Sequence, residues 1–194
     1  MQASISERFL FTSLSNILRG VINFVIVILI ARWLNPEDYG RMMFLLASFL
    51  AVKSLLDMAS TQAFITFISE RSRSKKFVSI YFFWVLIQLT FSILILGFIL
   101  PESLIKILWV GEDRLLIFLA LLAVFSQNVV WPIASGMAEA QRETIKVQKI
   151  AVVITFMHLI IVCLFSIIGR LAIPALFIAL LIEWGLGSFY AIKL

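Results

Sequence analysis

Long stretches without a charged residue constrain this chain more than any other feature. No Asp, Glu, Lys or Arg occurs within 77–101, 115–138 or 150–169. An α-helix rises about 1.5 Å per residue, so roughly 20 residues are enough to cross a hydrocarbon core about 30 Å thick. Each stretch reaches that length, and the sequence therefore predicts helices that span a membrane.

Three more stretches of spanning length are interrupted by charge. They are 9–31, 42–69 and 171–192, which contain Arg19, Lys53 with Asp57, and Glu183. Charged residues make up only 14% of the chain, against roughly a quarter of a soluble domain, so the chain is too apolar to coat a water-soluble globule. We expect an all-α membrane protein in which 1–194 form a single lobe, a bundle of six transmembrane helices at about 9–34, 41–70, 76–100, 114–138, 147–169 and 171–193.

Basic residues divide unevenly between the two ends of these helices. Cytoplasmic loops of membrane proteins are enriched in Lys and Arg. One end carries nine of them, namely Arg8, Arg71, Arg73, Lys75, Lys76, Arg142, Lys146, Lys149 and Lys193. The other end carries five, namely Arg32, Arg41, Lys106, Arg114 and Arg170. The first end is therefore predicted to be cytoplasmic, with both termini there, and 101–111 are expected to form a short helix on the outer surface.

Several classes of function do not fit this distribution of residues. The net charge of +5 comes from Lys and Arg that lie mostly in short gaps between apolar stretches, so no nucleic-acid partner is expected. The single Cys163 has no second cysteine for a disulfide or a cysteine metal site, and we expect neither a metal nor a cofactor. The apolar stretch after Arg8 is longer than the core of a cleaved signal peptide, about 7 to 15 residues, so the first helix is expected to remain.

Polar residues within the spans form stripes near the middle of the membrane. A charge at that depth costs about 2.5 to 3.5 kcal/mol on insertion scales and normally faces the interior of a bundle. The outer halves of the first, second and sixth predicted helices are almost purely apolar, whereas their polar residues occupy the middle and the cytoplasmic half. This asymmetry predicts a cleft that opens to the cytoplasm and is lined by Asn16, Arg19, Asn23, Lys53, Asp57 and Glu183.

A structural network explains the same charges equally well. Lys53 and Asp57 are four residues apart and can pair on one helix, and Arg19 can pair with Glu183, so that the four charges sum to zero. His158, near the middle of the fifth predicted helix, is more often a hydrogen-bonding residue within a bundle than a proton relay. Both interpretations of the buried charges stay open at this point.

Two short segments carry a resemblance to a known family. The sequence ARWLNPEDYG at 31–40 is similar to the first extracytoplasmic loop of the polysaccharide and O-antigen flippases, which belong to the multidrug/oligosaccharidyl-lipid/polysaccharide exporter superfamily. That loop reads approximately A-R-x-L-G-P-E-D-Y/F-G, and Asn35 replaces its usual glycine. The sequence LLDMA at 55–59 is similar to the L-x-D-x-G of the family, with Ala59 in the place of glycine.

The resemblance implies a carrier that moves an undecaprenyl-pyrophosphate-linked oligosaccharide across the bacterial inner membrane by alternating access. Family members have about twice as many helices, arranged as two lobes, so this chain resembles the amino-terminal lobe. The expected partners are therefore the lipid-linked glycan, membrane lipid, and a second six-helix lobe or another copy of the chain. Basic residues on the first two helices of related flippases hold the pyrophosphate, and Arg19 and Lys53 are candidates by helix and depth.

Three other functions are alternatives to glycan-lipid transport. A rhomboid-like intramembrane serine protease would use Ser188 and His158, but its motif requires glycine where Phe189 stands, and its serine precedes its histidine, so no enzyme is expected. A multidrug or cation antiporter of the same superfamily would bind protons and drug at Asp57 and Glu183. An inactive truncated remnant is the third alternative.

Overall fold

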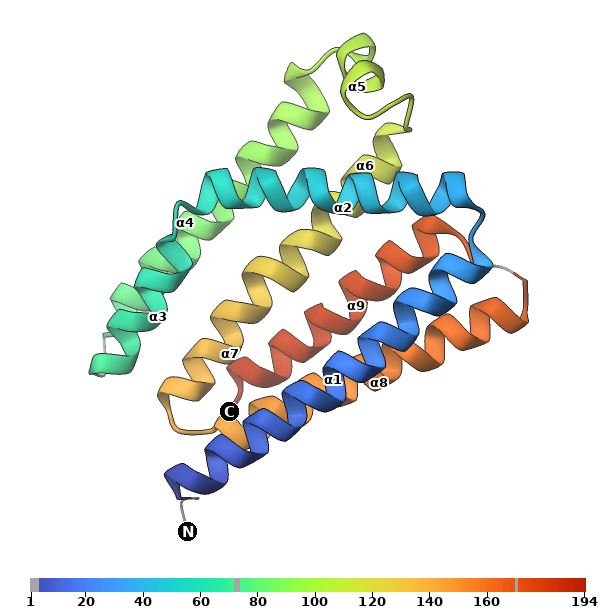
Figure 1. The fold of residues 1–194 in the computed structure, drawn as a ribbon. Coiled ribbons are helices and arrows are strands. Elements are labelled where there is room, and N and C mark those ends of the chain that lie inside the picture. Colours follow the sequence, from blue (N-terminus) through green and yellow to red (C-terminus); the bar gives the residue numbers. More distant parts are fainter. Residues whose placement is uncertain (1–3, 72–73, 170) are drawn as a thin grey trace.

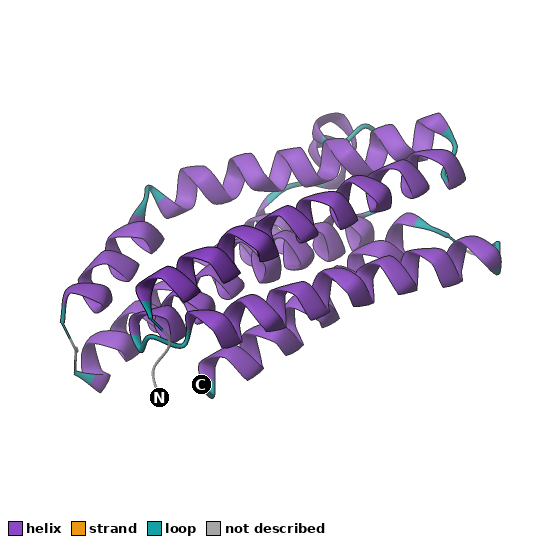
Figure 2. Ribbon diagram, turned by 60° about the horizontal axis from the view of Figure 1, so that its bottom comes forward, coloured by secondary structure: helices purple, strands orange, loops and turns teal. Residues whose placement is uncertain are grey.

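The computed structural model describes residues 4–71, 74–169 and 171–194, and in these ranges it contains helices and no strands (Figures 1 and 2). Arg73 and Arg170, which entered the prediction of topology, lie outside the described residues. The elements are α1 (Ile5–Trp33), α2 (Pro36–Asp57), α3 (Ser60–Glu70), α4 (Lys75–Leu94), η1 (Ile95–Ile99), α5 (Glu102–Leu108), α6 (Arg114–Phe125), η2 (Ser126–Val130), α7 (Trp131–Ala140), α8 (Thr144–Ile167) and α9 (Ile173–Ile192), where η1 and η2 are π-helical turns.

Six helical segments in the described part of the chain are long and apolar enough to cross a membrane. They are Ile5–Trp33, Pro36–Asp57, Lys75–Ile99, Arg114–Ala140, Thr144–Ile167 and Ile173–Ile192. The prediction of an all-helical chain with six helices capable of spanning a membrane is thereby confirmed. The amino and carboxyl ends lie at the same end of the bundle (Figures 1 and 2), as an even number of spans requires. Their cytoplasmic placement remains a prediction.

The second predicted span is not one continuous helix over 41–70, and that prediction was wrong. Met58 and Ala59 adopt left-handed backbone conformations, with φ of 43° and 63°, so α2 ends at Asp57 and α3 begins at Ser60. Left-handed residues cannot continue the ladder of hydrogen bonds of a right-handed helix. The segment also begins earlier than predicted, because the Asn35 side chain accepts a hydrogen bond from the backbone N–H of Asp38 and caps a helix whose first residue is Pro36.

The short helix expected within 101–111 is present as α5. Of its apolar residues, Ile105 is buried in the core, while Leu104 and Leu108 are exposed. Trp109, directly after the helix, stacks on Phe49 of α2 with ring centroids 5.8 Å apart. This helix therefore closes over the core at the end of the bundle that holds the α1–α2 turn.

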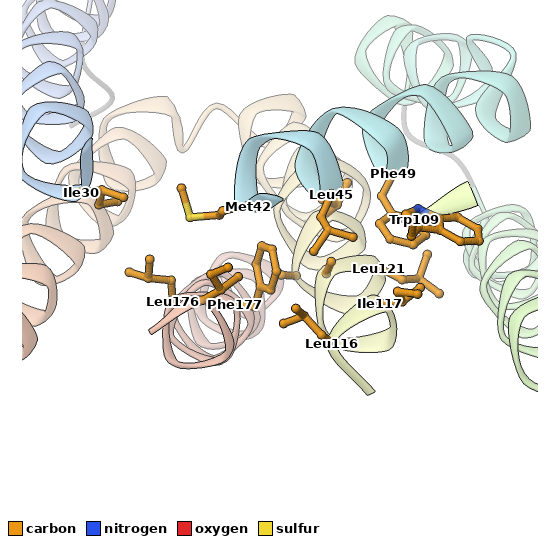
Figure 3. Packing of buried hydrophobic residues seen from close by; sticks show 14 of the residues in the cluster. Ile30, Met42, Leu45, Phe49, Trp109, Leu116, Ile117, Leu121, Leu176 and Phe177 are labelled. Carbon is orange, nitrogen blue, oxygen red and sulfur yellow. The ribbon is translucent and has the colours of Figure 1, made fainter. Parts of the chain in front are cut away.

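The hydrophobic core is continuous at one end of the bundle and divided at the other. At the end that holds the α1–α2 turn, one cluster joins α1, α2, α5, α6 and α9 through residues that include Ile30, Leu45, Ile105, Ile117 and Phe177 (Figure 3). At the end that holds the termini, two separate clusters form. One packs α7, α8 and α9 around Trp131, Ala151 and Ala191, and the other packs α3, α4, η2 and α7 around Phe64, Val85, Val129 and Ile133.

Helix α1 illustrates this change along the bundle. Its carboxyl half contributes Ile26 and Ile30 to the continuous cluster, whereas Ser15 is the one residue before Ile26 that is buried. Figure 1 shows α1 and α2 meeting at their shared turn and diverging toward the end that holds the termini. Helices α1 and α2, two of the three helices predicted to carry polar stripes, are thus joined by apolar packing at one end only.

Candidate functional site

Asp57 lies at the break between α2 and α3 and caps the second of these helices. Its Oδ1 accepts hydrogen bonds from the Thr61 backbone N–H at 2.9 Å and from the hydroxyls of Ser60 and Thr61, each at 2.8 Å. Its Oδ2 lies 3.0 Å from the Lys53 ammonium, one helical turn earlier. The prediction that Lys53 and Asp57 can pair on one helix is therefore confirmed, and Asp57 is fully engaged by neighbouring donors.

Two side chains of α4 complete the hydrogen bonding around the break. The Tyr81 hydroxyl donates to Thr61 Oγ1 at 2.9 Å, and the Gln88 amide donates to the backbone carbonyl of Leu56 at 2.9 Å. A backbone carbonyl at a helix end that is removed from water requires such a partner. Tyr81 and Gln88 thus tie α4 to the point where α2 and α3 separate.

Arg19 joins α1 to α8. Its guanidinium donates to the Asn16 side-chain oxygen on its own helix and to Gln148 Oε1 at 3.3 Å. The Gln148 amide in turn donates to the Glu139 carboxylate at 3.4 Å, and that carboxylate attracts the Arg19 charge. The Arg19 Nε is buried without a hydrogen-bond partner in the described residues. This guanidinium therefore retains an unused donor.

Glu183 and His158 form a pair between α9 and α8. The Glu183 Oε2 lies 2.8 Å from the His158 Nδ1, and Glu183 is 3% exposed. The alternative pairing of Arg19 with Glu183 does not form, because in the described part of the chain each of the two takes other partners. The sequence had marked His158 as a polar residue within a span, but it did not indicate this partner.

The six predicted site residues thus fall into separate groups. Asn16 and Arg19 are in contact on α1, Lys53 and Asp57 are in contact on α2, and Glu183 lies with His158. Asn23 is exposed on α1, one turn beyond Arg19. Arg19 and Glu183 lie on the terminal side of the continuous apolar cluster, since Arg19 precedes its Ile26 and Glu183 follows its Phe177, each by about two turns. The common cleft remains a prediction.

A second ionic cluster lies at the opposite end, near the α1–α2 turn. Arg41 of α2 binds both carboxylate oxygens of Glu112 in the turn before α6, and its Nη2 lies 2.7 Å from Oε2. Arg41 Nη1 also lies 3.0 Å from Asp38 Oδ1. Glu112 is 3% exposed, so this bidentate pair is largely removed from solvent on the carboxylate side. It ties α2 to the turn above α6 where the apolar cluster is continuous.

The chemistry available in these groups is anion binding by two cations. Arg19 and Lys53 stand on helices that diverge, and the carboxylates near them already accept hydrogen bonds. Within 4–71, 74–169 and 171–194, no group of three or more His, Cys, Asp or Glu side chains is placed to hold a metal ion. Comparison with models of protein families, with curated proteins and with solved structures finds no match to this chain.

Proposed function

We propose that this chain is one lobe of a carrier that flips an undecaprenyl-pyrophosphate-linked oligosaccharide across the bacterial inner membrane. The observation that carries the proposal is the position of Arg19 and Lys53, partly buried cations on two helices that leave a common apolar cluster and diverge. The similarity of 31–40 and 55–59 to the flippase motifs supports the same assignment. The pyrophosphate head group is the part of the substrate that these two cations would bind.

The hydrogen bonds of Arg19 and Lys53 are compatible with reversible binding of a ligand. Arg19 has an unused Nε donor, and a planar guanidinium can donate two parallel hydrogen bonds to phosphate oxygens. If Lys53 turns from Asp57 to a phosphate, Ser60 and Thr61 still donate three hydrogen bonds to Asp57 Oδ1, and Oδ2 then requires a water molecule in place of the ammonium. The pair found between Lys53 and Asp57 is therefore compatible with both a structural and a substrate-binding role.

The division of the core favours loading from the side of the termini. Apolar packing and the Arg41–Glu112 pair join α2 to its neighbours at the end of the α1–α2 turn. Beyond that cluster α1 and α2 are not joined by a common core. A carrier that receives its cargo from the cytoplasm rests in such a form, provided that the termini are cytoplasmic as the basic residues predict.

A second lobe is part of this proposal, because the polar stripe of α1 needs a cover. Phe9, Leu14 and Phe24 are each more than 60% exposed and can face lipid. Asn16 and Asn23 are exposed on the same helix, and Arg19 lies between them. Polar groups facing hydrocarbon are strongly unfavourable, so alternating access around this stripe requires a separate six-helix lobe or a second copy of the chain.

Complementation of a bacterial strain that lacks its own flippase tests the proposal. Residues 1–194 should fail alone and should restore surface glycan when a carboxy-terminal lobe is supplied. Replacing both Arg19→Ala and Lys53→Met should then reduce export at least tenfold, since a hydrogen bond to a charged group contributes about 1.5 to 3 kcal/mol. The matched control is Lys106→Ala, because the ion pair of Lys106 in the described residues is with exposed Glu102 on α5. Full rescue by the monomeric chain alone, or by the double variant with the second lobe, would contradict the proposal.

A further inference from the structure

The His158–Glu183 pair has an unusual feature in its second carboxylate oxygen. Glu183 Oε2 takes the contact of 2.8 Å with His158 Nδ1, whereas Glu183 Oε1 is buried and has no hydrogen-bond partner in the described residues. The side chains are 2% exposed for Glu183 and 12% for His158. An ionised carboxylate in such a place would have one buried oxygen without a partner among the described residues.

Apolar residues of α8 and α9 flank the pair along both helices. One turn beyond Glu183, Gly187 lies against Ile154, which is one turn before His158, and a Cβ at Gly187 would meet the end of the Ile154 side chain. The Trp131 ring of α7 lies on the same spot, 3.4 Å from that Cβ position. On the other side of the pair, Val162 lies one turn after His158 and Ala179 lies one turn before Glu183, and both are buried. The pair is thus bracketed by apolar contacts on both sides.

No other charge lies close to the pair on its own helices. Within one turn of His158 or of Glu183 the sequence has no further ionisable side chain. The nearest ionic cluster, formed by Arg19 and Glu139 through Gln148, meets α8 ten residues from His158, which is about 15 Å along the helix. The elements packed against α8 and α9 are α1, α6, α7 and η2. The ionisable groups of all these helices are Glu7, Arg8, Arg19, Arg32, Arg114, Glu139, Lys146, Lys149, Cys163 and Tyr190, with Lys193 directly after α9, and η2 contributes none.

We propose that His158 and Glu183 form a binding site for one proton inside the α8–α9 interface. One proton added to a neutral imidazole and a carboxylate makes the pair electrically neutral, whether it sits on Nδ1 as imidazolium or on Oε2 as carboxylic acid. Without that proton the pair carries one negative charge, and Glu183 Oε1 is left as a bare anionic oxygen in an apolar environment. The proton is therefore a ligand that the buried geometry requires.

Release of the proton is tied to movement of the helices. The proton must pass to a water molecule, and the remaining carboxylate must then be hydrated. Separation of α9 from α8 near Gly187 and Ile154 would give water access to Glu183, whose side chain is 2% exposed. Deprotonation and opening of this interface are therefore one event, which gives α8 and α9 two states that differ by one proton. The site needs no glycan, so it stands apart from the proposed transport.

The single histidine of the chain makes this site directly observable. The full chain would be labelled with ring-¹⁵N histidine and placed in lipid nanodiscs for NMR at pH 7. A bound proton gives one of two patterns. If the imidazole holds the proton, both ring nitrogens are protonated. If Glu183 holds it and donates to Nδ1, then Nδ1 is bare and Nε2 is protonated. An unprotonated pair gives the opposite tautomer, since Nδ1–H must then donate to the carboxylate and Nε2 is bare.

We expect one of the first two patterns at pH 7. The matched control is Glu139→Gln, which removes a carboxyl group from the Arg19 cluster and should leave the histidine signals unchanged. A spectrum with Nδ1 protonated and Nε2 bare at pH 7 would overturn the proposal.

Discussion

Replacing Ala59 by glycine is expected to stabilise the protein, although glycine usually weakens a helical membrane segment. Ala59 has φ of 63° between α2 and α3, and a left-handed conformation costs an L-residue roughly 1 to 2 kcal/mol. Glycine avoids this cost but loses more conformational entropy on folding, about 0.5 to 1 kcal/mol. The net gain expected for Ala59→Gly is therefore about 0.5 to 1 kcal/mol. The side chain of Ala59 is exposed, so little packing is lost.

The matched control lies one turn away. Ala63 is also exposed but belongs to the interior of α3, where Ala63→Gly should destabilise by about 0.5 to 1 kcal/mol. The two variants should thus differ by about 1 to 2 kcal/mol, which is about tenfold in the unfolding equilibrium constant. The assay is reversible unfolding in mixed micelles with increasing mole fraction of dodecyl sulfate, followed by circular dichroism. If both glycine variants lose the same stability, the helix runs unbroken through Ala59 and the reasoning is refuted.

Three further expectations follow from the ionic contacts and the topology. Arg41→Ala should lower the free energy of unfolding by about 2 to 3 kcal/mol in the same assay, because it leaves the buried Glu112 carboxylate unpaired, whereas Asp38→Asn should cost less than about 1 kcal/mol. Equal losses would mean that the Glu112 pair is not stabilising. Asp57→Ala should cost about 1 to 2 kcal/mol through loss of the cap of α3, and Asp57→Asn clearly less, since the amide oxygen still accepts from the Thr61 N–H. Alkaline phosphatase fusions should be active at Asn35, Glu112 and Arg170 and silent at Arg73 and Glu143, and the reverse pattern would place the termini outside.

The six spans could be predicted because membrane insertion acts on length and charge, which the sequence displays directly. The break at Met58 and Ala59 could not, since neither residue favours a left-handed conformation and no proline or glycine marks the place. The break depends on Asp57, which caps α3, and on Gln88, which binds the freed carbonyl of Leu56 from another helix. The flippase motif that 55–59 resembles has glycine where Ala59 stands, but no break was predicted from this difference.

Some of the polar contacts could be predicted from the sequence, and others could not. The Lys53–Asp57 pair is local, and its spacing of four residues predicts it on any helix. The Arg19–Gln148 and His158–Glu183 contacts join residues that are 129 and 25 positions apart, so they depend on how the helices are rotated and shifted against one another. Charge balance alone suggested the pairing of Arg19 with Glu183, and it gave the wrong partners because it contains no information on that packing.

The beginning of α2, in contrast, is marked by local residues in the sequence. Asn35, Pro36 and Asp38 form a local signal for a helix start, in which a capping side chain precedes a proline at the first helical position. The prediction placed the ends of the spans from the charged residues alone, so it put the start of this helix at about residue 41. Reading the capping residues together with the charges would have placed it correctly.

Cysteine accessibility tests the central claim most directly, namely that the polar face of α1 is open to water from the side of the termini while its other half is closed. In a background with Cys163→Ser, single variants Asn16→Cys and Asn23→Cys would be compared with Val27→Cys and Ala175→Cys, which lie beside the continuous apolar cluster. A membrane-impermeant thiol reagent added from the cytoplasmic side of inverted vesicles should label the first two and spare the last two. Equal labelling of the four positions, or labelling of Asn16→Cys and Asn23→Cys only from the outer side, would contradict the account.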